Sequence, residues 1–351
     1  MELVAEIGTG HNGSLDNARR LLDEVADAGF DCAKFQWVIA AEIIHPHAGL
    51  VPLPGGPTPL YERFKQLEQT PDFYHALKQE TEVRGLSFLC TPFGLGSLQS
   101  LVSLHVSRIK VASPELSHTP LLNAVADLGL PVIASTGVNT LGDIDEANRC
   151  LRSSELTFLH CVTAYPAPEN EYNLRSLKTR SAATGREWGV SDHSLDPVAV
   201  PLVACSVGAS MLEKHVTLTR AGTGLDDPVS LEPQQFREMV REVRSLEREQ
   251  ERGESVRERL GSTRVERILG ISTIELADSE QGNYGRTNRS IHATRALARG
   301  EIIDESNTSV LRTEKELNPG LHPRYYRVLT GKKTTRAVSD GAGITWDDVL
   351  T

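Results

Sequence analysis

The chain has 351 residues, a formal net charge of −10 and five cysteines. This length suffices for one large core plus a smaller domain, and the negative charge argues against a nucleic-acid backbone or an anionic membrane surface as the partner. The cysteines form no C-x-x-C pair and no apolar run reaches the roughly 18 residues of a membrane-spanning helix, so we expect a cytoplasmic protein without a disulfide framework or zinc ribbon.

Short apolar segments alternate with longer amphipathic ones over the first two-thirds of the chain. Strands are predicted at Leu3–Gly8, Cys32–Val38, Ser87–Phe93, Arg108–Ser113, Pro131–Gly137, Leu156–Tyr165, Trp188–His193 and Met211–Leu218. Helices are predicted between and after them at Leu15–Ala28, Pro71–Arg84, Leu95–Leu104, Thr119–Leu128, Leu141–Arg152, Leu174–Ala183, Pro197–Val207 and Pro233–Arg252. Eight βα units in about 250 residues predict an α/β fold, the (β/α)₈ TIM barrel.

The first strand-to-helix connection contains Gly8, Gly10 and Gly13, which spell G-x-G-x-x-G. Alone this spacing is a weak signal for a dinucleotide-binding loop in an open, doubly wound sheet. A nicotinamide oxidoreductase is therefore an alternative, although the eight repeats and a lysine on the second predicted strand favour the barrel.

Three further segments differ in composition from the barrel units. Residues 39–60 are Pro-rich, apolar and predicted to be irregular, which is typical of a lid, a binding loop or a disordered segment. A run of charged residues follows position 246, and the tail beyond 284 has the pattern of short strands and turns. The sequence thus predicts a barrel over 1–246, a linker over 247–284 and a small β-rich domain over 285–351, which is too small to be stable undocked.

Polar side chains near the carboxyl ends of the predicted strands indicate a site, because active sites of TIM barrels lie there. Two lysines and several hydroxyls predict a phosphate or carboxylate site: Lys34, Lys110, Thr91, Ser113, Ser135, Thr163 and Ser191. His193 and His215 end sequence-adjacent strands, so both imidazoles reach one divalent cation if these strands pair. Taken singly, each lysine or histidine also fits a purely structural role.

The same residues lie in motifs that resemble the sialic acid synthase family. The motifs are Ala5-Glu6-Ile7-Gly8, Ala33-Lys34-Phe35-Gln36, Cys90-Thr91-Pro92-Phe93, Ile109-Lys110-Val111-Ala112-Ser113-Pro114-Glu115, Ala134-Ser135-Thr136-Gly137, Thr163-Ala164-Tyr165-Pro166, Val190-Ser191-Asp192-His193 and Leu212-Glu213-Lys214-His215. In the tail, Arg289-Ser290 and Gly331-Lys332-Lys333 resemble the antifreeze-like (SAF) domain that ends members of this family. The resemblance covers nearly the whole chain.

The resemblance implies condensation of phosphoenolpyruvate with an N-acetylated hexosamine, such as N-acetylmannosamine, to a nonulosonic acid and phosphate. By position, the lysines and hydroxyls named above match residues that hold phosphoenolpyruvate, and Glu6 and Glu115 match catalytic carboxylates. His193 and His215 match ligands of a metal, Mn²⁺ with Mg²⁺ or Co²⁺ as alternatives. Contacts to the acceptor sugar are matched by Gln36, Tyr165, Asp226 and Arg289.

The family also implies a homodimer in which the SAF domain of one subunit lends Arg289 to the barrel of the other. Residues 37–70 contain no Asn, although relatives commonly place an acceptor-binding Asn in this segment. The acceptor therefore stays open among sialic, legionaminic, pseudaminic and spore-coat sugars, and a non-catalytic sugar-binding protein is a further alternative.

Overall fold

Eight parallel strands form the centre of the protein, in a computed structural model that describes residues 1–53 and 56–350. They are β1 (Glu2–Gly8), β2 (Cys32–Trp37), β5 (Ser87–Pro92), β6 (Ile109–Val111), β7 (Val132–Ser135), β8 (Leu156–Cys161), β9 (Glu187–Asp192) and β10 (Met211–His215). Their order in the sheet is β5-β2-β1-β10-β9-β8-β7-β6, and β5 also lies beside β6. The predicted barrel is confirmed, and the doubly wound sheet required by the oxidoreductase alternative is absent from the described residues.

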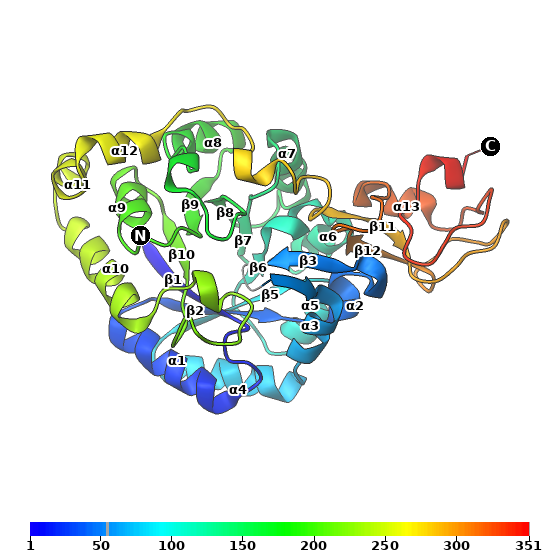
Figure 1. Cartoon of the computed structure of the whole chain (residues 1–351), viewed down its shortest axis with the longest axis horizontal. Helices are drawn as coiled ribbons and strands as arrows, with labels where there is room; N and C mark the ends of the chain where they lie inside the picture. The colour runs from blue at the N-terminus through cyan, green and yellow to red at the C-terminus, as the bar shows by residue number, and fades with distance from the viewer. Residues whose placement is uncertain (54–55, 351) are drawn as a thin grey trace.

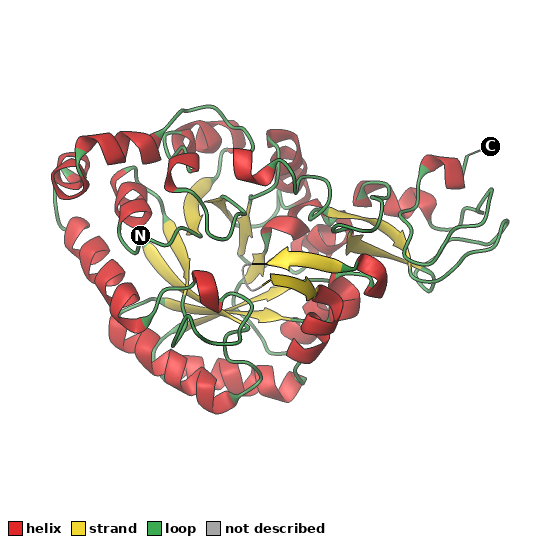
Figure 2. Cartoon of the chain, viewed as in Figure 1, coloured by secondary structure: helices red, strands yellow, loops and turns green. Residues whose placement is uncertain are grey.

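Helices surround these strands on the outside (Figure 2). They are α1 (Leu15–Ala28), α4 (Pro71–Glu82), α5 (Leu95–Val102), α6 (Thr119–Asp127), α7 (Leu141–Cys150), α8 (Ser176–Thr184), α9 (Ala199–Ser206) and α10 (Pro233–Leu246). In α1 the Ser14 hydroxyl accepts the N–H of Asn17, and Gly29 ends the helix with a φ of 88°. That left-handed conformation favours glycine and turns the chain toward β2.

The interior of the barrel changes from an apolar layer to a polar layer two residues further along the strands. Its lower layer is an apolar cluster of Val4, Cys32, Leu89, Ile133, Leu159 and Met211. Because side chains alternate in direction along a strand, the residues two positions later also point inward. These residues, Glu6, Lys34, Thr91, Ser135, Cys161 and Glu213, all line one cavity. The apolar layer therefore closes the barrel beneath a polar floor at the carboxyl ends of the strands.

Residues 39–60, predicted to be irregular, contain regular structure, and the prediction is wrong there. The helix α2 (Ala40–Ile43) and the antiparallel strands β3 (Leu50–Leu53) and β4 (Gly56–Pro59) precede α3 (Leu60–Leu67). Ile43, Leu60 and Phe64 pack with Phe93 in a small separate core, which explains the apolar composition. We call residues 40–53 and 56–67 the cover; residues 54 and 55 of the Pro-rich run lie outside the described residues.

The segment predicted as a linker is largely helical in its first half. The helices α11 (Arg252–Leu260) and α12 (Ser262–Leu269) lie against α9. Val256, Val265 and Ile268 from these helices are buried in the main core of the barrel. Packing of the barrel therefore continues beyond residue 246, and the connecting segment proper comprises residues 270–288.

The small C-terminal domain lies to one side of the barrel, with the C-terminus on its far side (Figure 1). Its strands β11 (Arg289–Ala293) and β12 (Thr308–Arg312) pair antiparallel, followed by a short helix α13 (Tyr326–Leu329). The domain has a core of its own and contacts α2 and α6 of the same chain. Exchange of this domain between two subunits stays a prediction. Among the described helices, none is long and apolar enough to cross a bilayer.

Candidate active site

A cavity of about 460 Å³ opens at the carboxyl ends of the barrel strands. It is lined by thirteen of the fifteen residues predicted for the site: Glu6, Lys34, Gln36, Thr91, Lys110, Ser113, Ser135, Thr163, Tyr165, Ser191, His193, His215 and Asp226. All eight strands of the barrel, or the loops that follow them, supply these side chains, which explains why residues far apart in the sequence meet.

Two buried lysines and one carboxylate form the charged floor of the cavity. The Nζ atom of Lys34 lies 3.0 Å from Glu213 Oε2, and Lys110 Nζ lies 3.6 Å from the same oxygen. Lys110 also donates to the Ser135 hydroxyl at 2.7 Å, and the Ser191 hydroxyl donates to Glu213 at 2.9 Å. Burial lowers the pKa of the Lys110 ammonium to about 8, whereas the two lysines outweigh burial and hold the pKa of Glu213 well below its usual range.

Glu213 was missed as a site residue, although the sequence contains its signal. It lies two positions before His215 on β10, so the same alternation that turns His215 inward turns Glu213 inward.

Thr91 has a buried hydroxyl oxygen that finds no hydrogen-bond partner within the described part of the chain. A buried hydroxyl at a cavity wall that lacks a protein partner fits a position for a ligand oxygen.

Glu6 lies beside this floor and contacts one of its lysines. Its Oε1 accepts a hydrogen bond from Gln36 at 2.7 Å, and its Oε2 lies 3.1 Å from Lys34 Nζ. Burial raises the pKa of the Glu6 carboxyl, and the neighbouring Glu213 adds to this. Asp226, from the loop after β10, has its pKa raised to about 6 by burial and by Glu6. Two carboxyls with raised pKa values therefore reach the cavity, as proton carriers near neutral pH require.

The two predicted metal ligands come together on the neighbouring strands β9 and β10. The ring centroids of His193 and His215 are 5.4 Å apart, and Tyr165 stacks on His193 at 4.4 Å. His193 donates its Nδ1–H to the carbonyl of Val162 at 2.9 Å, so Nε2 is the ring nitrogen that remains for a metal. Burial and the neighbouring His193 hold the pKa of His215 well below its usual value, so it is neutral. The neighbouring Cys161 outweighs burial and raises the pKa of His193 to about 9, so binding of a metal there would release a proton from its ring. Two imidazoles beside Asp226 form a donor set that suits a divalent metal such as Mn²⁺ or Zn²⁺.

The structure does not bring the other two predicted residues to the cavity. Glu115, in the 3₁₀ turn Ser113–Ser117, is fully buried, and its Oε1 accepts hydrogen bonds at 2.8 Å from both Arg289 and Arg312. Arg289 also donates to the carbonyls of Ile43 and Phe93 at 3.0 and 2.8 Å. These two residues join barrel, cover and C-terminal domain, and among the described residues the arginine that lines the cavity is Arg312.

The outer wall of the cavity combines the cover with the C-terminal part of the chain. The cavity is lined by Val51, Leu60 and Phe64 of the cover and by Leu225 and Val229 of the β10–α10 loop. Asn283 and Thr287 of the connecting segment and Arg312, Glu314 and Lys315 of the C-terminal domain complete the lining. The sequence did not predict that these segments form one wall, because the cover and the C-terminal domain come together there only through tertiary packing.

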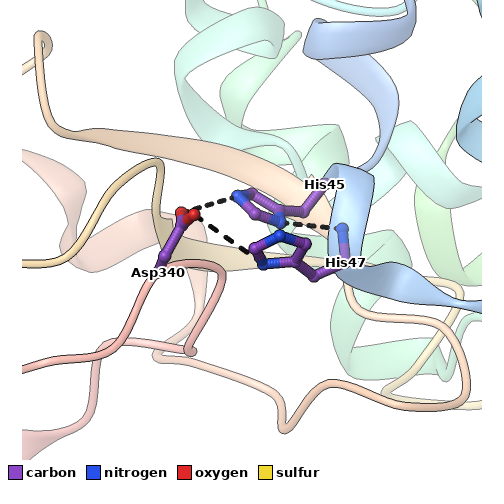
Figure 3. A group of neighbouring side chains, drawn as sticks. All are labelled: His45, His47 and Asp340. Atoms are coloured by element: carbon purple, nitrogen blue, oxygen red, sulfur yellow. Dashed lines mark hydrogen bonds and ion pairs between the residues drawn. The ribbon is translucent and has the colours of Figure 1, made fainter.

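His45 and His47 of the cover form a separate cluster with Asp340 of the C-terminal domain (Figure 3). His45 Nδ1 accepts the backbone N–H of His47 at 3.1 Å, so its proton lies on Nε2, which donates to Asp340 Oδ1 at 3.1 Å. Burial lowers the pKa of His45, in agreement with this neutral form. If Nε2 of His45 bound a metal, the ring proton would move to Nδ1, where it would point at the N–H of His47, so two donors would face each other. The cluster is therefore a hydrogen-bonded contact between cover and domain.

Comparison with known proteins agrees with this architecture. The profile of the NeuB family matches residues 21–255, and that of the SAF domain matches residues 288–350. The chain belongs to the NeuB family. It is 33% identical to the spore coat polysaccharide biosynthesis protein SpsE of Bacillus subtilis, over 99% of this chain and 93% of that protein. The crystal structure of SpsE covers 100% of this chain and 95% of its own, with a TM-score of 0.85 and 32% identity.

Other NeuB-family relatives differ in the sugar acid that their names give. The N,N'-diacetyllegionaminic acid synthase of Campylobacter jejuni is 31% identical, over 95% of this chain and 96% of that protein. The N-acetylneuraminate-9-phosphate synthase of Homo sapiens is 28% identical, over 96% of this chain and 89% of that protein. The resemblance inferred from the motifs is thus confirmed at the level of the family, and the names of these two relatives give different sugar acids.

Proposed function

We propose that the protein condenses phosphoenolpyruvate with an open-chain N-acetylated amino sugar to give a nonulosonic acid and inorganic phosphate. The observation that carries this proposal is the meeting, in one cavity, of a lysine and hydroxyl floor with a pair of imidazoles on neighbouring strands. The floor suits a small anion with several charges, such as phosphoenolpyruvate. The imidazoles suit a metal that would lie next to the polar amino sugar. The names of the NeuB-family synthases support this reaction class.

Phosphoenolpyruvate would bind with its phosphate and carboxylate on the floor. Lys34 and Lys110 neutralise its charge, and the hydroxyls of Thr91, Ser135 and Ser191 donate hydrogen bonds. Because these groups are buried and already fixed in place, they stabilise developing charge with little reorganisation. Ser113 and Thr163 line the same region and complete the set.

His193 and His215 would hold a divalent metal, which supplies Lewis acidity at the carbonyl oxygen of the acceptor. The hydrogen bond that fixes the ring of His193 through Nδ1 and the neutral state of His215 both favour this role. Tyr165 and Asp226 lie beside the imidazoles, and Gln36 lines the same cavity. These three residues would position the hydroxyls and the acyl group of the sugar. The methylene carbon of phosphoenolpyruvate then attacks the aldehyde carbon to form the new carbon–carbon bond.

Water must then add to the former enol carbon, and collapse of the tetrahedral intermediate breaks the carbon–oxygen bond to phosphate. Glu6 and Asp226 have raised pKa values, so they suit uptake of the water proton and delivery of a proton to the new hydroxyl. Glu213 stays ionised between two lysines and is unsuited to carry a proton. In this scheme Asp226 takes the proton-transfer role that the resemblance implied for Glu115, because Glu115 is hydrogen-bonded to Arg289 and Arg312.

The acceptor is the part of the proposal for which two versions compete. A sialic-type acceptor is one, and the acceptor of a legionaminic, pseudaminic or spore-coat pathway is the other. We infer that the apolar side chains of Val51, Leu60 and Phe64, which line the cavity, contact the acceptor and so contribute to the choice between the two. The cytoplasmic location and the domain-exchanged dimer stay predictions.

The test is release of phosphate by the purified full-length protein with Mn²⁺, phosphoenolpyruvate and a panel of N-acetylated mono- and diamino hexoses. We expect release that depends on one acceptor and on metal, and that is lost in Lys34→Met. No release with any acceptor would refute the proposal and would favour a non-catalytic sugar-binding protein.

A further inference from the structure

Strand β7 ends at Ser135 and the loop after β8 carries Thr163, and both residues line the cavity. The loops that follow these two strands are held by one side chain from the connecting segment. Glu280 is 3% exposed. Its Oε1 accepts the backbone N–H of Val138 at 2.8 Å and that of Thr163 at 2.6 Å. One carboxylate oxygen therefore fixes the spacing of two loops that belong to neighbouring strands.

The backbone that Glu280 holds is strained. Val138 has a φ of 49°, a left-handed conformation that β-branched residues rarely adopt, and its side chain is fully buried. Such residues cost about 1–3 kcal/mol and persist only where surrounding contacts fix them. Here the N–H of Val138 is bound by Glu280, and its carbonyl accepts a hydrogen bond from Asn288 Nδ2 at 2.8 Å. Both contacts come from the connecting segment.

This strained turn connects directly to residues of the floor. The N–H of Gly137 donates to the Ser113 hydroxyl at 3.0 Å, and Asn139 donates to the Ser113 carbonyl at 2.8 Å. Gly137 has no space for a side chain, since a Cβ atom there would lie 2.0 Å from Thr163 Oγ1. A shift of the turn would therefore displace Ser113, Ser135 and Thr163 together.

We propose that Glu280 and Asn288 are positioning residues for the phosphoenolpyruvate site, and that the connecting segment completes this site as well as joining the two domains. This inference rests on the proposed function only for the identity of the anion. Glu280 acts through the backbone of Val138 and Thr163. Its effect is to hold the three hydroxyls in the arrangement that fits one phosphate and carboxylate pair.

The experiment measures phosphoenolpyruvate affinity and amide hydrogen exchange in the full-length protein. Glu280→Ala leaves two N–H groups without their acceptor, so we expect the Kd and KM for phosphoenolpyruvate to rise about tenfold or more. Glu280→Gln keeps an oxygen acceptor and should stay within about threefold of wild type. Tyr284→Phe is the matched control, because the Tyr284 hydroxyl joins the same segment to Asp143 at 3.0 Å, on α7.

We expect the amides of Val138 and Thr163 to lose protection from exchange in Glu280→Ala and to keep it in Tyr284→Phe. Unchanged affinity together with unchanged protection in Glu280→Ala would overturn the inference. If wild type bound no phosphoenolpyruvate, the proposed function would fail, while hydrogen exchange would still decide whether Glu280 holds the turn. If Glu280→Ala does not fold, Asn288→Ala tests the same turn from the carbonyl side, with the same two outcomes.

Discussion

Lys110→Met should weaken use of phosphoenolpyruvate while changing the free energy of unfolding of the barrel only slightly. The side chain is 1% exposed, and its Nζ donates to Ser135 and lies 3.6 Å from Glu213. A hydrogen bond to a charged group contributes about 1.5–3 kcal/mol, which corresponds to a loss of roughly 10- to 150-fold in kcat/KM for phosphoenolpyruvate. Glu213 keeps Lys34 and Ser191 as partners. Replacing a buried ammonium by a thioether of similar length should therefore change the free energy of unfolding by less than about 1 kcal/mol.

The matched control is Lys214→Met, which replaces another buried lysine of the barrel, on β10. Its Nζ contacts Asp192 at 2.6 Å and does not line the cavity among the described residues. Removing one partner of a buried ion pair costs about 3–5 kcal/mol, so urea unfolding should show a large loss of stability with the KM for phosphoenolpyruvate within about threefold. Initial-rate kinetics and urea titration of both variants decide the matter. Unchanged kinetics in Lys110→Met, or equal kinetic losses in both, would refute the assignment of the anion site.

Three further predictions concern protonation, metal and domain docking. Burial lowers the pKa of Lys110 to about 8, so its charge is present below that pH and lost above it, and kcat/KM for phosphoenolpyruvate should fall as pH rises through about 8 in a pH–rate profile. His215→Ala should abolish the rise in melting temperature caused by Mn²⁺ and at least 99% of turnover, roughly 3 kcal/mol of transition-state stabilisation. Arg289→Ala leaves the buried Glu115 with Arg312 alone and should lower the free energy of unfolding by about 3 kcal/mol, measured in urea.

Each of these predictions has its own contradicting result. A KM for phosphoenolpyruvate that stays constant from pH 7 to 10 would exclude Lys110 as the titrating group. Stabilisation of His215→Ala by Mn²⁺ equal to that of wild type would place the metal elsewhere. The control for Arg289→Ala is Arg295→Ala, whose ion pair with Glu301 is half exposed and should contribute less than about 1 kcal/mol. Equal effects of the two substitutions would contradict the docking role of Arg289.

The features set by local periodicity could be predicted from the sequence. The alternation of apolar runs and amphipathic helices fixes eight βα units, and glycines such as Gly29 mark the helix ends. Once the barrel is assumed, strand position alone brings Lys34, His193 and His215 to one end. Glu213 follows from the same alternation, since it lies two positions before His215 on β10.

Features created by packing between distant segments could not be predicted in the same way. The cover looked irregular because its apolar residues pack with Phe93 and not along a single helix or strand. Glu115 and Arg289 matched site residues by motif, yet the buried contact between them depends on how the C-terminal domain docks. The role proposed for Glu280 has no local signature, since its partners are backbone N–H groups of loops more than a hundred residues away.

Mass spectrometry of the reaction in ¹⁸O-labelled water tests the central claim most directly. The proposed chemistry breaks the carbon–oxygen bond of phosphoenolpyruvate, so the phosphate released should carry no ¹⁸O. A product with the mass of the acceptor plus pyruvate, carrying ¹⁸O from water on the former enol carbon, should form in equal amount. Labelled phosphate, or phosphate released without such a product, would contradict the condensation and would indicate simple hydrolysis of the phosphate ester.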